Sequence, residues 1–120
     1  MVAERVMHFY VNSTAQVLHY STFYGGAGND DFFCLRPEGA NSLVAIGTTT
    51  SANTANVMAS AGAFQTTLSG AGTNGLIVKF NTTTNARTWG TYINPVSGNS
   101  LTLTCGQVDN GGNIYFGGYT

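Results

Sequence analysis

The chain has 120 residues, a length that suits one ordinary domain. Hydrophobic residues make up 42% of it, enough for a core, whereas charged residues make up only 8%, against about 25% in a typical soluble domain. The net charge of -1 provides no basic surface for phosphate backbones, so we expect no nucleic-acid partner. No apolar run approaches the roughly 18 residues of a membrane span. A polar, nearly uncharged surface favours an extracellular or cell-surface protein over an intracellular one.

Short runs rich in β-branched and aromatic residues alternate with turn clusters along the whole chain. The runs include LHYSTFY, LVAIG, GLIVKF and NIYFGG, and the turns include VNSTAQ, PEGANS, NTTTNA and VDNGGN. This pattern predicts an all-β fold with eight strands. We expect the strands at residues 6–12, 17–24, 31–36, 42–49, 75–81, 87–93, 101–107 and 113–119. A longer connection over residues 50–74 contains alanines that favour a helical turn, together with a glycine and threonines that favour a loop.

The sequence also repeats itself. Residues 8–24, HFYVNSTAQVLHYSTFY, align with residues 77–93, IVKFNTTTNARTWGTYI, at an offset of 69. After a slip of two residues, CLRPEGANSLVAIGTTT aligns with CGQVDNGGNIYFGGYT, so that Cys34 falls on Cys105 and Gly47 on Gly118. A period near 70 residues made of four antiparallel strands is typical of a β-propeller blade, although longer than the usual 40 to 50 or so.

Several phrases resemble those of the SBBP repeat, a β-propeller repeat of bacterial secreted and surface proteins. They are YSTFYGGAGNDD, AGAFQTT, GLIVKFN, TWGTYI and VDNGGNIYFGGYT, which together extend over about residues 8–120. PEGANS at residues 37–42 and NPVSGN at residues 94–99 depart from the family pattern. The resemblance implies a propeller scaffold with no single activity attached to it.

The position of the repeat within the chain predicts a single unit, residues 1–120, made of half a blade, a whole blade and another half. The three parts are expected at residues 6–24, 25–93 and 94–120. Because an isolated hairpin leaves open sheet edges, we expect the two half blades to be completed by other copies in a cyclic homo-oligomer of three or four chains, or by the rest of a longer propeller chain. The residues expected at that interface are Phe9, Val11, Tyr20, Phe23, Ile114, Tyr115 and Phe116.

Few residues suggest chemistry. Asn29, Asp30 and Asp31 form the densest acidic cluster, which indicates either a loop that binds Ca²⁺ or ligand, or a turn capped by a carboxylate. Asp109 is expected to form a turn. The segment of residues 70–75, GAGTNG, fits a dinucleotide-binding glycine pattern, but a strand follows it where that pattern needs a helix, so it predicts a loop.

The two cysteines, Cys34 and Cys105, occupy equivalent positions one blade apart, which predicts two buried free thiols and no disulfide. His8 and His19 lack a third ligand, so we expect neither a metal site nor a cofactor. Tyr20 and Trp89 share one position of the repeat, which favours packing between blades.

The sequence is compatible with two functions. The first is a non-enzymatic structural or binding module whose loops present a carbohydrate or protein ligand site. The second is a hydrolase or lyase with its site in the central channel of an assembled propeller. The second would require Asp30, Asp31, Arg36 or Glu38 to face that channel.

Overall fold

The computed structural model describes residues 6–11, 14, 17–70, 72–94 and 98–120, with the strand pairing alone described at residues 6–11. The described chain is all-β apart from one short 3-10 turn, Thr54–Asn56 (η1). The eight predicted strands are confirmed, with bounds within two residues of those expected. They are β1 (Val6–Val11), β2 (Leu18–Tyr24), β3 (Asp30–Glu38), β4 (Ser42–Thr49), β5 (Asn74–Asn81), β6 (Ala86–Ile93), β7 (Thr102–Val108) and β8 (Ile114–Tyr119).

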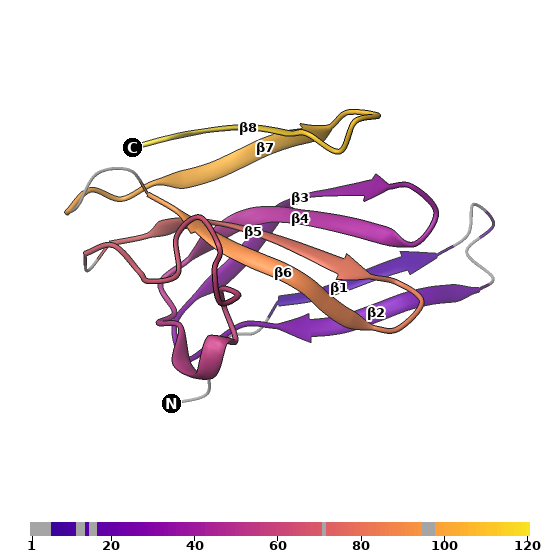
Figure 1. Ribbon diagram of the computed structural model, residues 1–120, viewed down its shortest axis with the longest axis horizontal. Coiled ribbons are helices and arrows are strands. Elements are labelled where there is room, and N and C mark those ends of the chain that lie inside the picture. Colours follow the sequence, from indigo (N-terminus) through magenta and orange to yellow (C-terminus); the bar gives the residue numbers. More distant parts are fainter. Residues whose placement is uncertain (1–5, 12–13, 15–16, 71, 95–97) are drawn as a thin grey trace.

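The strands form three antiparallel sheets. Strands β3, β4, β5 and β6 make a central sheet in that order, while β1 pairs with β2 and β7 pairs with β8 in separate hairpins. One hairpin lies on each side of the central sheet (Figure 1). The molecule is therefore a stack of two strands, four strands and two strands, and the sheets do not close on one another.

The strands of the central sheet alternate their side chains between two separate apolar clusters, as a period of two requires. On β4, Leu43 and Ala45 point to one cluster, while Val44 and Ile46 point to the other. All four side chains are buried, because a hairpin covers each face of the sheet. A continuous apolar run such as LVAI is the expected sequence for a strand buried on both faces.

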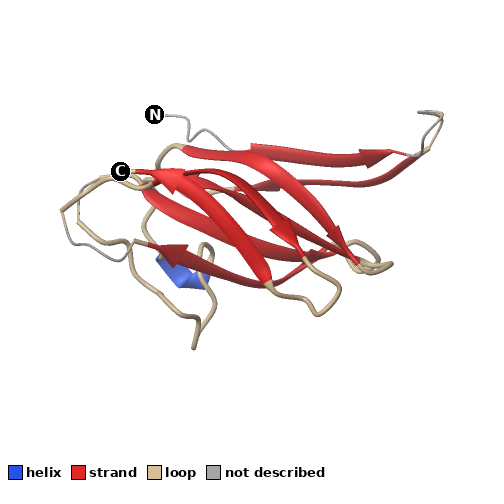
Figure 2. Cartoon of the chain, turned by 90° about the horizontal axis from the view of Figure 1, so that it is seen from above, coloured by secondary structure: helices blue, strands red, loops and turns tan. Residues whose placement is uncertain are grey.

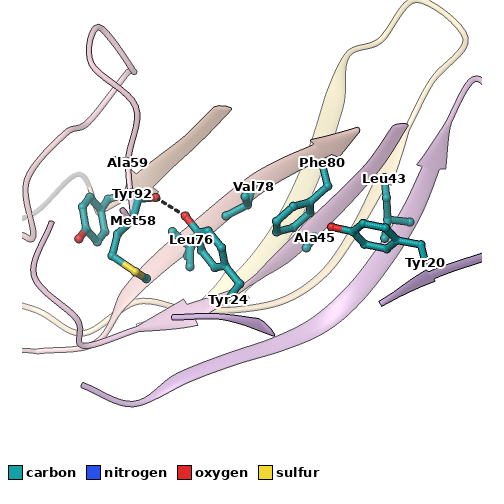
Figure 3. Packing of buried hydrophobic residues seen from close by; sticks show 10 residues of the cluster. All are labelled: Tyr20, Tyr24, Leu43, Ala45, Met58, Ala59, Leu76, Val78, Phe80 and Tyr92. Carbon is teal, nitrogen blue, oxygen red and sulfur yellow. Dashed lines mark hydrogen bonds between the residues drawn. The ribbon is translucent and has the colours of Figure 1, made fainter. Parts of the chain in front are cut away.

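The first cluster joins the central sheet to the β1–β2 hairpin. Tyr20 and Tyr24 of β2 pack against Phe80 of β5, with ring centroids 6.1 and 5.4 Å apart respectively. Met58 and Ala59 of the long loop complete this cluster beside Tyr92 (Figure 3). Burying aromatic rings of this size contributes several kcal/mol, on the order of 1.5–3 for each large apolar side chain.

The second cluster joins the opposite face to the β7–β8 hairpin. Its buried members are Cys34, Val44, Ile46, Ile77 and Leu103. Leu103 of β7 is the residue that the hairpin buries most deeply in it, and Trp89, Val108 and Ile114 pack around its rim. Both hairpins are thus held to the central sheet by side-chain packing and not by strand pairing.

The two hairpins carry the same irregularities as their counterparts in the central sheet. In the β1–β2 pair, His19 is an extra residue in the ladder, and Thr88 is the extra residue in the β5–β6 pair. These two bulges are 69 residues apart, the offset found in the sequence. The β3–β4 and β7–β8 pairs likewise share a bulge, at Phe33 and Thr104, 71 residues apart. Matching bulges mean that the paired strands have the same register and the same faces.

Beside the bulges at Phe33 and Thr104, the β3–β4 and β7–β8 pairs each have a glycine at a position where no side chain fits. A Cβ added to Gly47 would lie 1.9 Å from the carbonyl oxygen of Asp31. A Cβ added to Gly118 would lie 1.9 Å from the carbonyl oxygen of Thr102. The bulge brings the two backbones together at that point, which is a known reason for glycine inside a strand.

The connection between β4 and β5 covers the outer edge of the central sheet. Ser60 donates its backbone N–H to the carbonyl of Gly90, and Tyr92 donates its own to the carbonyl of Gln65, at 2.9 and 3.1 Å. The loop therefore pairs backbone groups of β6 at Gly90 and Tyr92, which protects this part of the edge strand. This loop and its short helix lie at the opposite end of the strands from the β3–β4 and β5–β6 turns (Figure 2).

Candidate functional site

The acidic cluster at residues 29–31 separates into one buried and two exposed side chains. Asp30 begins β3 and is almost completely buried, whereas Asn29 and Asp31 are exposed. One carboxylate oxygen of Asp30 accepts the hydroxyl of Thr49, and the other accepts the hydroxyl of Ser51 at 2.9 Å and the N–H of Gly26 at 2.8 Å. Asp30 thus joins the segment before β3 to the end of β4.

This geometry is that of a structural carboxylate. Three donors converge on the two oxygens of Asp30, which compensates for removing a charged group from water. Ser51 is itself held, because its hydroxyl also accepts the N–H of Gly28 at 2.9 Å. Within the described ranges, no three His, Cys, Asp or Glu side chains come together in a cluster that could hold a metal ion.

A cleft of about 490 Å³ opens between the β3–β4 turn and the β7–β8 turn. Glu38 and Lys79 form an ion pair of 2.7 Å in it, and both side chains are about four-fifths buried. The cleft is lined by Pro37, Glu38, Gly39, Ser42, Lys79 and residues 108–112. This concave polar surface forms where the turn of the β7–β8 hairpin lies beside the β3–β4 turn of the central sheet, and so it is the candidate binding site.

The wall of the cleft formed by the β7–β8 turn is shaped by Asp109. Its carboxylate accepts the N–H groups of Gly111 and Asn113 at 2.8 and 2.9 Å, and the side-chain amide of Asn113 at 2.9 Å. These hydrogen bonds, those from Asn113 first, lower the pKa of the Asp109 carboxyl below its ordinary value. The prediction that Asp109 forms a turn is confirmed.

The long loop is fixed by two asparagines that sequence reasoning did not identify. Asn53 accepts the N–H groups of Met58 and Ala59 and donates to the carbonyls of Ala59 and Thr66. Asn74 is fully buried, accepts the N–H of Ser69, and donates to the carbonyls of Ser69 and Gly72. Nothing in an Asn/Thr-rich sequence marks these two, because their role depends on the path of the loop.

Two buried tyrosines also attach this loop to the strands. The hydroxyl of Tyr24 donates toward the carbonyl of Met58 (Figure 3) and toward that of Val57, both at 2.8 Å. The hydroxyl of Tyr92 donates to the carbonyl of Ser51 at 2.7 Å. Burial raises the pKa of Tyr24 and, much more, that of Tyr92. Arg87 donates to the carbonyls of Asn56 and Val57, which ties the same loop to β6.

The residues expected at an oligomer interface are not all in the same situation. Tyr20 is buried inside the chain against Phe80, and Ile114 is half-buried beside Leu103. Phe23, Tyr115 and Phe116 are exposed. The side chains of Phe9 and Val11 lie outside the described part of the structure.

The prediction of two buried thiols is half wrong. Both cysteines are free, as expected, and Cys34 is buried with its Sγ 3.3 Å from the carbonyl oxygen of Gly106. Strand β7 covers Cys34, whereas no strand of the described chain covers Cys105 on the outer face of β7, so Cys105 is exposed.

The histidines and the glycine pattern do not form a site in the described chain. His19 is exposed on the bulge of β2, and the side chain of His8 lies outside the described part. Residues 72–75 lead from the loop directly into β5, so the glycine pattern at residues 70–75 has no helix after it.

The residues of the enzyme hypothesis do not converge. Asp30 is enclosed by hydroxyl and N–H donors at one end of the strands, whereas Glu38 is paired with Lys79 at the other. Arg36 donates to the neighbouring carbonyl of Leu35, and Asp31 is exposed on β3.

Comparison of the sequence with models of known protein families and with curated protein sequences gave no match. Among the described residues, no helix has the length and apolar character needed to span a bilayer.

Proposed function

We propose that the chain is a non-enzymatic structural or binding module of a β-propeller, contributing half a blade, a whole blade and another half. The observation that carries the proposal is the grouping of the strands into sheets of two, four and two, with the same bulges in each hairpin and its counterpart. Stacking of the sheets through two apolar clusters, one on each face of the central sheet, supports the same architecture. The sequence phrases that resemble the SBBP repeat, such as YSTFYGGAGNDD and VDNGGNIYFGGYT, support the same proposal.

A binding role suits the way the polar groups are used. The carboxylates of Asp30 and Asp109 and the amides of Asn53 and Asn74 are all engaged in fixing loops and turns. A scaffold needs such fixed loops, because its ligands are recognised by surfaces between them. The cleft beside Glu38 and Lys79 is the place where a carbohydrate or protein ligand would bind, and an extracellular or cell-surface location fits the weakly charged surface.

Small-angle X-ray scattering of the chain at low concentration tests this architecture. If the hairpins stack on the central sheet as blade halves do, a single chain has a radius of gyration close to the 14.0 Å of its Cα atoms. A clearly larger value for a single chain, with the scattering of detached hairpins, would reject the stacked arrangement. The comparison is made where the forward scattering gives the mass of one chain, 12.6 kDa, because an associated species has a larger radius of gyration whatever its internal arrangement.

A further inference from the structure

The central sheet shows how a hairpin of the β7–β8 kind joins a hairpin of the β1–β2 kind. In that sheet β4 pairs with β5 along their whole length, from Ser42 opposite Asn81 to Thr49 opposite Asn74. Strand β8 is the counterpart of β4, and β1 is the counterpart of β5, by the shared bulges. Among the described residues, however, β8 pairs only with β7 and β1 only with β2, so neither strand has a partner there on the edge that β4 and β5 use for each other.

These two free edges cannot meet within one chain. The β1–β2 hairpin packs on one face of the central sheet through Tyr20 and Tyr24, and the β7–β8 hairpin packs on the other through Leu103. The four-stranded sheet lies between them (Figure 1). The strand that completes β8 must therefore come from outside this arrangement of 120 residues.

The side chains of β8 show the same incompleteness. Tyr115 and Phe116 are 61% and 44% exposed, while their counterparts Val44 and Ala45 on β4 are completely buried. Phe23 on β2 is 66% exposed, while its counterpart Tyr92 on β6 is completely buried. Large apolar side chains are thus exposed at the positions where the central sheet has its core, and a neighbouring blade would cover them.

We propose that a second copy of this chain occupies these edges: β8 of one copy pairs antiparallel with β1 of the next, and the copies close into a ring. The inference rests on the proposed propeller function and assigns its partner. Transferring the β4–β5 register by the two offsets places Phe116 opposite Phe9, Tyr115 opposite Tyr10 and Gly117 opposite His8. The joined hairpins form a sheet of four strands like the central one. A head-to-tail interface of this kind gives a ring when the rotation between copies closes. With two blades for each copy, a ring of three copies has six blades and a ring of four has eight, both within the range of known propellers.

The same transfer explains the two cysteines. Cys34 is covered by β7, the first strand of the following blade, through its contact with Gly106. The strand that would cover Cys105 in the same way is β3 of the next copy, because β3 is the counterpart of β7. An exposed Cys105 in the single chain therefore becomes a buried Cys105 in the ring.

Disulfide cross-linking tests the register. Residues directly opposite in an antiparallel pair have Cα atoms about 4.5–5.5 Å apart, within the span of a disulfide. In a chain whose Cys34 and Cys105 are replaced by alanine, the double variant Phe9→Cys with Phe116→Cys should oxidise to covalent oligomers that end at a closed trimer or tetramer. The control, His8→Cys with Phe116→Cys, is one residue out of register, and adjacent strand positions face opposite sides. It should give less than a tenth as much cross-linked product.

Equal cross-linking of both variants would overturn the register, and its absence in both would overturn the pairing. A second pair of variants guards against loss of folding in the cysteine variants. In the protein that keeps its natural Cys34 and Cys105, Phe116→Lys should shift the oligomer to monomer. The control Phe64→Lys changes an 82% exposed phenylalanine of the long loop and should leave the oligomer intact. A monomeric wild-type chain with the compact scattering described above would reject self-assembly while leaving the propeller architecture standing.

Discussion

Replacing Asp30 by alanine is expected to lower the free energy of unfolding by about 4 kcal/mol, a large part of the stability of a domain of this size. The change removes both acceptors for the hydroxyls of Thr49 and Ser51 and for the N–H of Gly26, all in a buried position. A hydrogen bond to a charged group contributes about 1.5–3 kcal/mol, and buried donors left without a partner add their own cost. Urea denaturation followed by circular dichroism measures the difference.

The neighbouring carboxylate is the matched control. Asp31 is exposed on the same strand, so Asp31→Ala should change the free energy of unfolding by less than about 0.5 kcal/mol. Equal effects of the two substitutions would mean that Asp30 does not have the buried, structural role assigned to it.

Gly47→Ala is expected to be nearly as damaging, with a loss of about 3 kcal/mol or more. The new Cβ would lie 1.9 Å from the carbonyl oxygen of Asp31 and 2.7 Å from the Cα of Phe32, both on the backbone of the paired strand. Because backbone atoms cannot rotate away as a side chain can, β3 and β4 must separate at the bulge. Overpacking of a rigid core typically costs about 1–3 kcal/mol, and here a strand pair is disrupted as well. Thermal and urea denaturation report the loss.

Two further glycines make this prediction specific. Gly118→Ala should disrupt the β7–β8 hairpin in the same way, since its Cβ would meet the carbonyl of Thr102 at the equivalent bulge. Gly117→Ala, one residue earlier, would meet only the sulfur of Cys105 at 3.3 Å and should be tolerated within about 1 kcal/mol. If Gly117→Ala proved as harmful as Gly118→Ala, the shared bulge would not be the reason for the glycines.

The strands of this protein could be predicted from the sequence because their signals are local. Runs such as LVAIG and GLIVKF favour extended backbone, and clusters such as PEGANS and VDNGGN end them. The sequence repeat also aligns Gly47 with Gly118. The reason for these glycines, a close backbone contact beside a bulge, appears only in the three-dimensional structure. Bulge positions depend on how two strands meet, and no single run of residues specifies that.

The candidate sites were harder to predict, because burial depends on which sheet covers which. Sequence equivalence gave Cys34 and Cys105 the same expected burial, yet in the described chain only Cys34 is covered by a further hairpin, β7–β8. Asp30 and Asp31 are neighbours of the same kind, and the alternation of a strand makes one structural and the other exposed. The anchoring roles of Asn53 and Asn74 arise from a loop path that composition does not determine.

The central claim is that the β1–β2 and β7–β8 hairpins are complementary parts of one sheet that a neighbouring copy completes. Native mass spectrometry of the purified chain tests it most directly. We expect a discrete species of three or four times 12.6 kDa. A species of 12.6 kDa alone at every concentration, or an open-ended series of masses without a closed ring, would contradict it.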